Sequence, residues 1–309
     1  MDRMRAKLLL LLVLVLAASG AAFAGQQPRR WQRNPWLLKN VEVTRDIEYD
    51  RAGDTPLLLD LYVPPKKPDG PLPIVVWIHG GGWRGGDKRR CRALLLVKRG
   101  YAVASVNYRL SREATFPAQI HDCKSAIRWI RANAKKYSID PDRIGVWGGS
   151  AGGHLVALLG TSGGVKALEG DGANLDQSSR VQAVADFCGP ADLTAFKGAD
   201  RSRRLLEAFL GGPVDDNLAK AALASPVTHI TKDDPPFLIM HGSADPVVPA
   251  AQSRRLPTAL KKAGIDTTLR IIEGAGHGVS GPGVHNQVTA FFDKHLNPKT
   301  EQAPDAPEE

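Results

Sequence analysis

The pentapeptide Gly-Gly-Ser-Ala-Gly at positions 148–152 places one nucleophilic side chain, Ser150, between glycines. It follows the apolar run 144–147 and opens the helical pattern 151–159. A serine at a sharp turn between a strand and a helix has its hydroxyl lifted clear of the backbone, and G-x-S-x-G in that context is typical of a serine nucleophile. Flanking residues without bulk let the strand and the helix approach each other. The pattern therefore predicts that Ser150 attacks a carbonyl carbon.

A serine hydroxyl needs a base to take its proton, and that base needs an acid to orient it. His277 lies in the glycine-rich segment 273–278, directly after the last apolar run, and Asp245 directly follows the seventh. The chain order Ser, Asp, His is the order found in serine hydrolases built on a parallel α/β sheet. We predict His277 as the base and Asp245 as the acid. Asp192, after the sixth run, remains the alternative acid.

The remaining histidines have other expected roles. His154 lies four residues into the helix that follows the nucleophile and is expected to pack. His241 ends a strand and is expected to hydrogen-bond loop backbone.

Residues 79–83, His-Gly-Gly-Gly-Trp, follow the apolar run 73–78. Attack on an ester creates an oxyanion, which backbone N–H groups that already face it can stabilise. Successive glycines present such groups without side-chain clashes, so Gly81 and Gly82, with Ala151 at the helix start, are the expected donors. His79 is expected to brace the loop rather than react. A phosphate-binding turn is disfavoured, because no G-K-[ST] follows the glycines.

Eight short apolar runs supply the elements that must position these loops, and helical patterns separate most of them. The runs are 41–49, 57–63, 74–78, 101–106, 144–147, 181–188, 237–240 and 268–272, and the helical patterns are 90–99, 117–137, 151–159, 201–210, 250–263 and 284–295. From the third run onward they are continuous rather than alternating, as expected for strands covered on both faces. The first two are joined by a short turn, which indicates an antiparallel edge. We predict an α/β fold with an eight-stranded, mostly parallel sheet, helices on both faces, and the three loops meeting at one edge.

The two ends of the chain differ from this domain, which we assign to residues 40–296. Residues 1–24 combine Arg3, Arg5 and Lys7 with the apolar run 8–16 and a small-x-small site at 22–24, the pattern of a secretory signal peptide. The run is too short to span a bilayer stably, so a secreted or periplasmic protein without stable membrane insertion is expected. Residues 25–39 are predicted to be an irregular leader and 297–309 a disordered acidic tail.

Composition narrows the possible partners. The apolar set makes up 43% and charged residues 24%, an ordinary globular balance. The net charge is +9, but the basic residues are scattered, which argues against a nucleic-acid site. The three cysteines, Cys91, Cys123 and Cys188, leave at least one free thiol or an intermolecular bridge, and whether Cys91 pairs with Cys123 stays open. No spacing resembles a metal site, and no cofactor is expected.

Together, residues 79–83, 148–154, 241–245 and 276–278 resemble the α/β-hydrolase esterases and lipases related to hormone-sensitive lipase. The strings 83–88, 107–109 and 116–119 make the nearer resemblance the bacterial branch with acetyl-xylan and feruloyl esterases. The resemblance spans residues 40–296 and implies the same triad and oxyanion donors. By analogy Trp83 would line the substrate pocket, with a buried packing role as the alternative. Segment 161–180 is a long insertion to which the sequence assigns no role. The leader is too short for the helical cap of many lipases, which suggests an open site.

The expected chemistry is hydrolysis of a carboxylic ester through a covalent acyl-enzyme, on short-chain or carbohydrate-linked esters such as acetyl or feruloyl groups. Amide hydrolysis, by a peptidase or an arylformamidase, is the second candidate because the same triad cleaves amides. A non-catalytic binding protein on a hydrolase scaffold is disfavoured, because every catalytic element is intact. The natural ester and the oligomeric state are left open.

Overall fold

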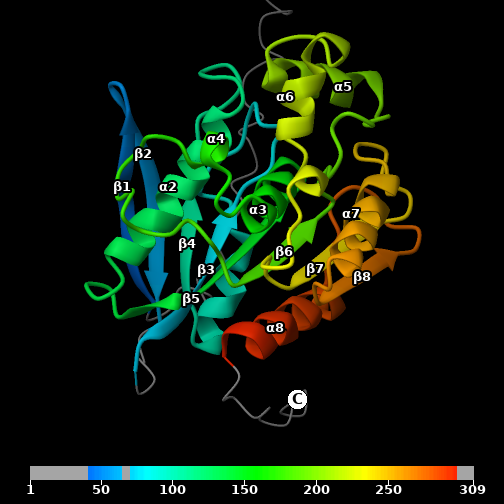
Figure 1. Cartoon of the computed structure of the whole chain (residues 1–309). Coiled ribbons are helices and arrows are strands. Elements are labelled where there is room, and N and C mark those ends of the chain that lie inside the picture. The colour runs from blue at the N-terminus through cyan, green and yellow to red at the C-terminus, as the bar shows by residue number, and fades with distance from the viewer. Residues whose placement is uncertain (1–40, 65–69, 298–309) are drawn as a thin grey trace, which may run out of the picture. The chain divides into compact units, whose positions relative to one another are not determined.

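A computed structural model of the protein describes residues 41–64 and 70–297 (Figure 1). The predicted signal peptide, the whole of the leader, all of the acidic tail except residue 297, and the short stretch 65–69 lie outside the described residues. The chain divides into Met1–Lys39 and Asn40–Glu309, and all described residues belong to the second unit.

Eight strands form one sheet in the order β1-β2-β4-β3-β5-β6-β7-β8. They are β1 (Glu42–Ala52), β2 (Thr55–Val63), β3 (Leu72–Ile78), β4 (Ala102–Val106), β5 (Ile139–Gly149), β6 (Ala183–Phe187), β7 (Phe237–Gly242) and β8 (Thr267–Ile272). β2 pairs antiparallel with β1 and with β4, and every other neighbouring pair is parallel. The eight predicted strands and the antiparallel edge are confirmed.

The helices follow the predicted pattern with additions. They are the 3₁₀ helices η1 (Arg92–Arg99), η2 (Asp215–Asn217) and η3 (Pro226–Thr228), and α2 (Ala118–Ala132), α3 (Ala151–Thr161), α4 (Lys166–Glu169), α5 (Asp200–Leu210), α6 (Leu218–Leu223), α7 (Ala251–Lys262) and α8 (Pro282–Leu296). The predicted helix 117–137 was too long, because the Asn133 side chain donates to the Trp129 carbonyl and Ser138 takes a left-handed backbone.

Both faces of the sheet are covered, which is why β3, β4, β6 and β7 are buried along their whole length. A Cβ on Gly145 of β5 would touch Phe292 of α8, so this face packs on α8. The next residue of β5 is Val146, level with Val184 of β6, and Val184 lies against Gly160 of α3. Successive strand residues point to opposite faces, so α3 and α8 cover opposite sides of the sheet.

The sheet brings two of the predicted loops side by side. β3 lies between β4 and β5, and Ile78 at the end of β3 is level with Gly148 in β5. After β3 the chain first adds β4 on one side of it and then crosses to add β5 on the other side. In open α/β sheets, ligands bind in the crevice at such a switch point. The glycine loop after β3 and the Ser150 turn after β5 both open into it.

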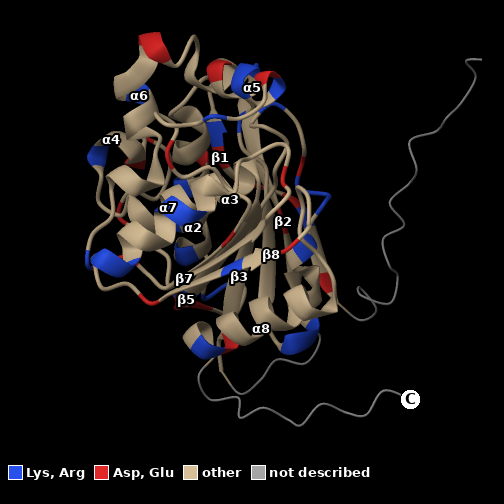
Figure 2. Cartoon of the chain, turned by 90° about the vertical axis from the view of Figure 1, so that its right-hand side faces the viewer, with Lys and Arg blue, Asp and Glu red and all other residues tan. Residues whose placement is uncertain are grey.

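Charged side chains are spread over the described part of the chain. Figure 2 shows Lys and Arg on several helices and loops with Asp and Glu among them, as the scattered basic residues of the sequence predict. Among the described residues, no helix is both long enough and apolar enough to cross a membrane.

Candidate active site

Ser150 lies in a strained turn between β5 and α3. Its φ is +59° and its ψ is −123°, a backbone conformation that residues other than glycine rarely adopt. The Ser150 N–H donates to the Phe187 carbonyl at 2.7 Å, which ties the turn to the end of β6. A Cβ on Gly148 would overlap the carbonyl of Gly152, and a Cβ on Gly152 would overlap that of Ile78. The flanking glycines are therefore required by close backbone approach, as predicted.

Asp245 and His277 are brought together from the loops after β7 and β8. The His277 Nδ1 lies 2.7 Å from Asp245 Oδ2, while the Asp245 side chain is buried and the His277 side chain is 24% exposed. Asp245 Oδ1 accepts the N–H groups of Val247 and Val248 at 2.8 and 3.0 Å. An imidazole whose Nδ1–H is donated to a carboxylate has its Nε2 lone pair free to take a proton.

The environment keeps Asp245 ionised. Burial alone would raise the pKa of this carboxyl, but hydrogen bonds from His241, from His277 and from the backbone of Val247 and Val248 outweigh it. The net effect holds the pKa of Asp245 well below its usual range.

His241 is a second imidazole on the same carboxylate, and sequence reasoning did not find this contact. Its Nε2 lies 3.0 Å from Asp245 Oδ2 and donates to the Val248 carbonyl at 2.9 Å. Its Nδ1 accepts the Ser253 hydroxyl at 2.6 Å, and the ring is fully buried. The predicted bond to loop backbone is present. The available signal was a histidine at a buried strand end, four residues before the expected acid.

The alternative acid, Asp192, is engaged elsewhere. Its Oδ2 accepts from Arg255 at 2.9 Å, and its Oδ1 accepts the Thr194 hydroxyl at 2.6 Å. The imidazole of His277 is bonded to Asp245 instead. The geometry thus favours Asp245 as the partner of the base.

Ser150 and His277 open onto the same edge of the sheet. Cys188 follows β6 and lies with Asp245 and His277 in a cluster whose ligand atoms are within 4.8 Å of one another. The residue before Cys188 is Phe187, the backbone partner of Ser150. Within residues 41–64 and 70–297, Ser150 Oγ makes no hydrogen bond to His277. That contact of the triad stays a prediction, since such bonds often tighten only when substrate binds.

The glycine loop after β3 packs against the nucleophile. A Cβ on Gly80 would lie 2.5 Å from the Gly149 carbonyl and 3.3 Å from Ser150 Cβ. Gly81 and Gly82 have φ values of +120° and +61°, which turn the loop sharply. Gly81 and Gly82 lie outside the helices and strands. Among the described residues, neither of their N–H groups donates a hydrogen bond to another backbone group. They are therefore available to a ligand.

His79 braces this loop, as predicted. It is 3% exposed, its Nδ1–H donates to the Gly80 carbonyl at 2.9 Å, and its ring stacks on Tyr108 at 4.4 Å between centroids. The Tyr108 hydroxyl donates to the His79 carbonyl at 2.9 Å. Burial lowers the pKa of His79, so this side chain is a neutral structural group at pH 7.

Trp83 is a buried packing residue in this structure. It is 5% exposed, its ring stacks on Phe209 at 4.5 Å between centroids, and its Nε1–H donates to His154 Nδ1 at 3.2 Å. His154 in turn donates from Nε2 to the Ala224 carbonyl at 2.7 Å, and burial lowers its pKa to about 4. His154 packs as predicted. For Trp83 the geometry favours the packing alternative, and a substrate contact stays a prediction.

Helix α5 lies against the glycine loop. A Cβ on Gly82 would lie 2.7 Å from Leu205 Cδ1, and Phe209 of the same helix stacks on Trp83. In Figure 1, α5 and α6 stand above the sheet on the connection between β6 and β7. The site is therefore flanked by a helix on this side. The expectation of an open site stays a prediction, since the leader lies outside the described residues.

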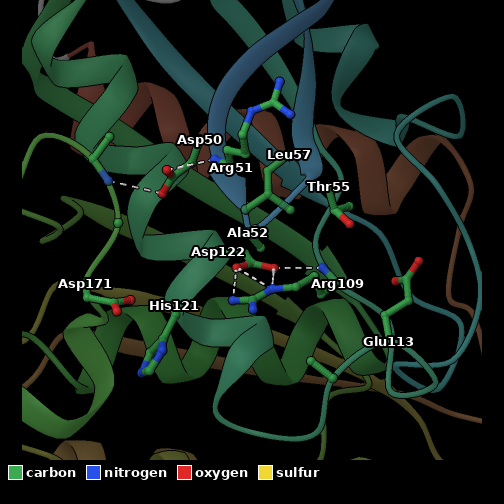
Figure 3. A pocket seen from close by; sticks show the side chains of 14 residues that line it. Asp50, Arg51, Ala52, Thr55, Leu57, Arg109, Glu113, His121, Asp122 and Asp171 are labelled. Carbon is green, nitrogen blue, oxygen red and sulfur yellow. Dashed lines mark hydrogen bonds and ion pairs between the residues drawn. The ribbon is translucent and has the colours of Figure 1, made fainter.

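A separate hollow of about 680 Å³ lies on the side of the sheet that carries β1 and β2 (Figure 3). Its wall includes Asp50, His121 and Asp171, and the ion pair of Arg109 with Asp122 at 2.6 Å. Neither Ser150, Asp245, His277 nor the glycines of the loop line it. This hollow is distinct from the candidate active site.

Residues 59–260 match the model of the BD-FAE family, and this range is more than half of the chain. The chain belongs to the BD-FAE family. Residues 219–304 also match the model of the TAP-like protein family. Membership agrees with the α/β-hydrolase fold seen here and with the resemblance to esterases and lipases noted in the sequence.

Two curated relatives come from Mycobacterium tuberculosis. The esterase LipQ is 37% identical over 232 residues, which are 72% of this chain and 54% of LipQ. The probable carboxylic ester hydrolase LipM is 36% identical over 249 residues, or 74% of this chain and 56% of LipM. The chain thus spans about half the length of these relatives.

Solved structures cover more of the chain. A truncated carbohydrate esterase from gut microbiota is 34% identical, with a TM-score of 0.72 over 82% of this chain and 95% of that one. The esterase Est2 of Thermogutta terrifontis is 31% identical, with a TM-score of 0.68 over 85% of this chain and 96% of its own. The same esterase has been solved phosphonylated by sarin, and in that form it matches with 30% identity and a TM-score of 0.71 over 88% of this chain and 100% of its own.

Proposed function

We propose that the protein is a serine carboxylic ester hydrolase with Ser150 as nucleophile, His277 as base and Asp245 as the acid that orients the base. The observation that carries this proposal is the 2.7 Å hydrogen bond between His277 and the buried carboxylate of Asp245, at the sheet edge that also holds the strained Ser150 turn. Relatives named esterases support the reaction class. The relative phosphonylated by sarin supports a covalent route.

The proposed reaction has two steps. His277 Nε2 takes the proton of Ser150 Oγ as this oxygen attacks the ester carbonyl, and the oxyanion is held by the N–H groups of Gly81, Gly82 and Ala151. The alcohol leaves with the proton from His277, and the acyl group stays on Ser150. Water then attacks the acyl-enzyme in the same way and releases the acid.

For the substrate we propose a short-chain or carbohydrate-linked ester, such as an acetyl or feruloyl ester. Two structural neighbours are described as a carbohydrate esterase and as a bifunctional GH43-CE protein, which supports this class. Amide hydrolysis, by a peptidase or an arylformamidase, is the alternative that shares the same triad, and a non-catalytic binding protein is the less favoured one.

Rates on p-nitrophenyl acetate, butyrate and decanoate, on acetylated xylan and methyl ferulate, and on a peptide anilide test the proposal. We expect the acetate and butyrate to be cleaved fastest and Ser150→Ala to lose nearly all turnover while keeping the circular dichroism of the parent. A fluorophosphonate probe should add its mass to the peptide that carries Ser150. Turnover of the anilide alone would replace the ester hydrolase with an amide hydrolase.

Two matched carboxylate variants test the acid. Asp245→Asn should lower kcat by a factor on the order of 10³–10⁴, because the amide favours the wrong imidazole tautomer. Asp192→Asn should change kcat far less, since Asp192 is bonded to Arg255 and Thr194. The opposite ranking would assign the acid to the loop after β6.

We also propose, from the sequence of residues 1–24, that the protein is exported to the periplasm or the medium. Expression of the full chain in a bacterial host should yield a mature protein that begins at Gly25, read by mass spectrometry of the N-terminal peptide. Recovery of an uncleaved chain from the cytosol would contradict export.

A further inference from the structure

Cys188 is a free thiol at the active edge of the sheet, and the proposed reaction does not use it. It follows β6, is 2% exposed, and has a left-handed φ of +55°. Its backbone is fixed, because its N–H donates to the Met240 carbonyl at 2.8 Å. Sγ of Cys188, a carboxylate oxygen of Asp245 and a ring nitrogen of His277 all lie within 4.8 Å of one another.

One sulfur, one nitrogen and one oxygen form a set of donor atoms that some metal ions bind better than others. Zn²⁺ and similar soft or borderline cations bind thiolate, imidazole and carboxylate together, whereas Mg²⁺ and Ca²⁺ prefer oxygen alone. In a tetrahedral zinc site the ligand atoms stand roughly 3.5 Å apart, so the more widely spaced of these atoms would have to close by up to about 1 Å. His277 Nδ1 and Asp245 Oδ2, which are 2.7 Å apart, would have to separate or bind through their other atoms. Three protein ligands leave the fourth position to water.

His277 is the ligand that can make this adjustment. A Cβ added to Gly276 or to Gly278 would meet nothing within 4 Å, so both glycines have open space beside their Cα atoms, while the Gly276 carbonyl packs against Gly242. The side chain of His277 is 24% exposed, so an ion can reach this ligand from solvent. Cys188 and Asp245, by contrast, are held by backbone hydrogen bonds.

We propose that Cys188, Asp245 and His277 form an inhibitory site for a thiophilic divalent cation such as Zn²⁺ or Cd²⁺. On binding, the Cys188 thiol releases its proton to solvent, and the ion takes one lone pair of the imidazole. At Nε2 the ion occupies the lone pair that would accept the proton of Ser150. At Nδ1 it confines the remaining ring proton to Nε2, so the ring is again unable to act as a base.

The effect on turnover rests on the proposed function, whereas binding of the ion does not. The two are separated by using Cd²⁺ as the probe in the Ser150→Ala background, where a cadmium–thiolate charge-transfer band in the near ultraviolet reports binding without catalysis. We expect this band in Ser150→Ala and in Ser150→Ala with Cys91→Ala, the matched thiol control. It should be lost in Ser150→Ala with Cys188→Ala and weakened at least about tenfold in affinity with His277→Ala.

Hydrolysis of p-nitrophenyl acetate gives the second readout. In a buffer that does not chelate metals, micromolar Zn²⁺ or Cd²⁺ should inhibit the parent protein, EDTA should restore the rate, and Mg²⁺ should have no effect. Cys188→Ser and Cys188→Ala, each compared with its own metal-free rate, should need at least about tenfold more metal for half inhibition. A band that survives Cys188→Ala, or equal sensitivity of parent and variant, would overturn the site. Absence of hydrolysis alongside an intact band would reject the proposed function and leave the site standing.

Discussion

Asp186 is a buried carboxyl in β6, and its ionisation should set part of the pH dependence of stability. The residue is fully buried, its Oδ1 accepts the Gly189 N–H at 2.9 Å, and its Oδ2 has no hydrogen-bond partner among the described residues. Burial raises the pKa of Asp186 to about 6, against a smaller opposing effect of the Gly189 N–H. The folded protein therefore holds this proton more tightly than the unfolded chain does.

The sign and the size of the effect follow from this difference in pKa. Because the folded state binds the proton more tightly, the free energy of unfolding falls as pH rises from the unfolded value of about 3.8 to the folded value, and stays low above it. A shift of about two pKa units corresponds to roughly 3 kcal/mol. Between about pH 4.5 and pH 8 the free energy of unfolding should fall by about 2 kcal/mol. The rest of the decrease already occurs below pH 4.5.

Asp186→Asn removes this ionisation and keeps an oxygen to accept the Gly189 N–H. Urea unfolding followed by circular dichroism at several pH values between about 4.5 and 8 should show the variant gaining stability relative to the parent as pH rises, by about 2 kcal/mol in total. Asp54→Asn, at an exposed position in the turn between β1 and β2, is the control for the loss of one negative charge. A difference between Asp186→Asn and the parent that is the same at every pH would refute the reasoning.

Three further variants test the site and its support. His241→Leu removes the donor 3.0 Å from Asp245 Oδ2 and should lower kcat on p-nitrophenyl acetate by roughly 10- to 100-fold with little change in KM, as a hydrogen bond to a charged group contributes about 1.5–3 kcal/mol. Gly80→Ala sets a Cβ 2.5 Å from the carbonyl before the nucleophile, and kcat should fall by about 10²-fold as the oxyanion donors shift. Lys124→Met breaks an ion pair of 2.6 Å between the buried Lys124 and the partly exposed Glu169, and it should lower the free energy of unfolding by about 1–3 kcal/mol in urea, since Glu169 keeps Arg128 as a partner.

Each of these variants has a matched control. His241→Gln retains an N–H group that can reach the carboxylate, so it should keep more activity than His241→Leu, and equal losses would argue against a positioning role. Gly283→Ala, where an added Cβ meets nothing within 4 Å, should leave kcat unchanged. Lys98→Met, at an exposed position, should unfold at the same urea concentration as the parent. A Lys124→Met protein as stable as the parent would show that the ion pair of Lys124 with Glu169 makes no net contribution to stability.

The central strands could be predicted because a strand that is buried on both faces has a continuous run of apolar residues. The run 74–78 is wholly apolar and lies within β3, which is buried throughout. The first half of β5 has no such apolar run, because residues 140–143 are Asp, Pro, Asp and Arg. Arg143 pairs with Asp140 at 2.8 Å and donates to the Pro71 carbonyl at 2.6 Å, so polar contacts rather than apolar burial accompany this part of the strand.

The loops of the site could be predicted, but the contacts inside it only in part. Asp245 and His277 each follow a strand directly, and parallel strands end at one edge, so their meeting followed from topology. Cys188 and His241 also stand at strand ends, yet the sequence does not show which way such side chains turn. Their positions beside Asp245 depend on local bends, such as the left-handed φ of Cys188, that periodicity does not record.

The insertion 161–180 has a definite structural role, although no pattern in its sequence predicts one. Lys124 and Arg128 of α2 are 0% and 1% exposed in their side chains, and a buried cation is destabilising unless it is paired. Glu169 of the insertion pairs with both, and the carbonyls of Ser162 and Ala173 accept further hydrogen bonds from them. The insertion thus supplies the acceptors that allow α2 to bury two positive charges. Its contacts run to α2 rather than to the catalytic loops, so shortening it should destabilise the fold before it alters the chemistry at the nucleophile.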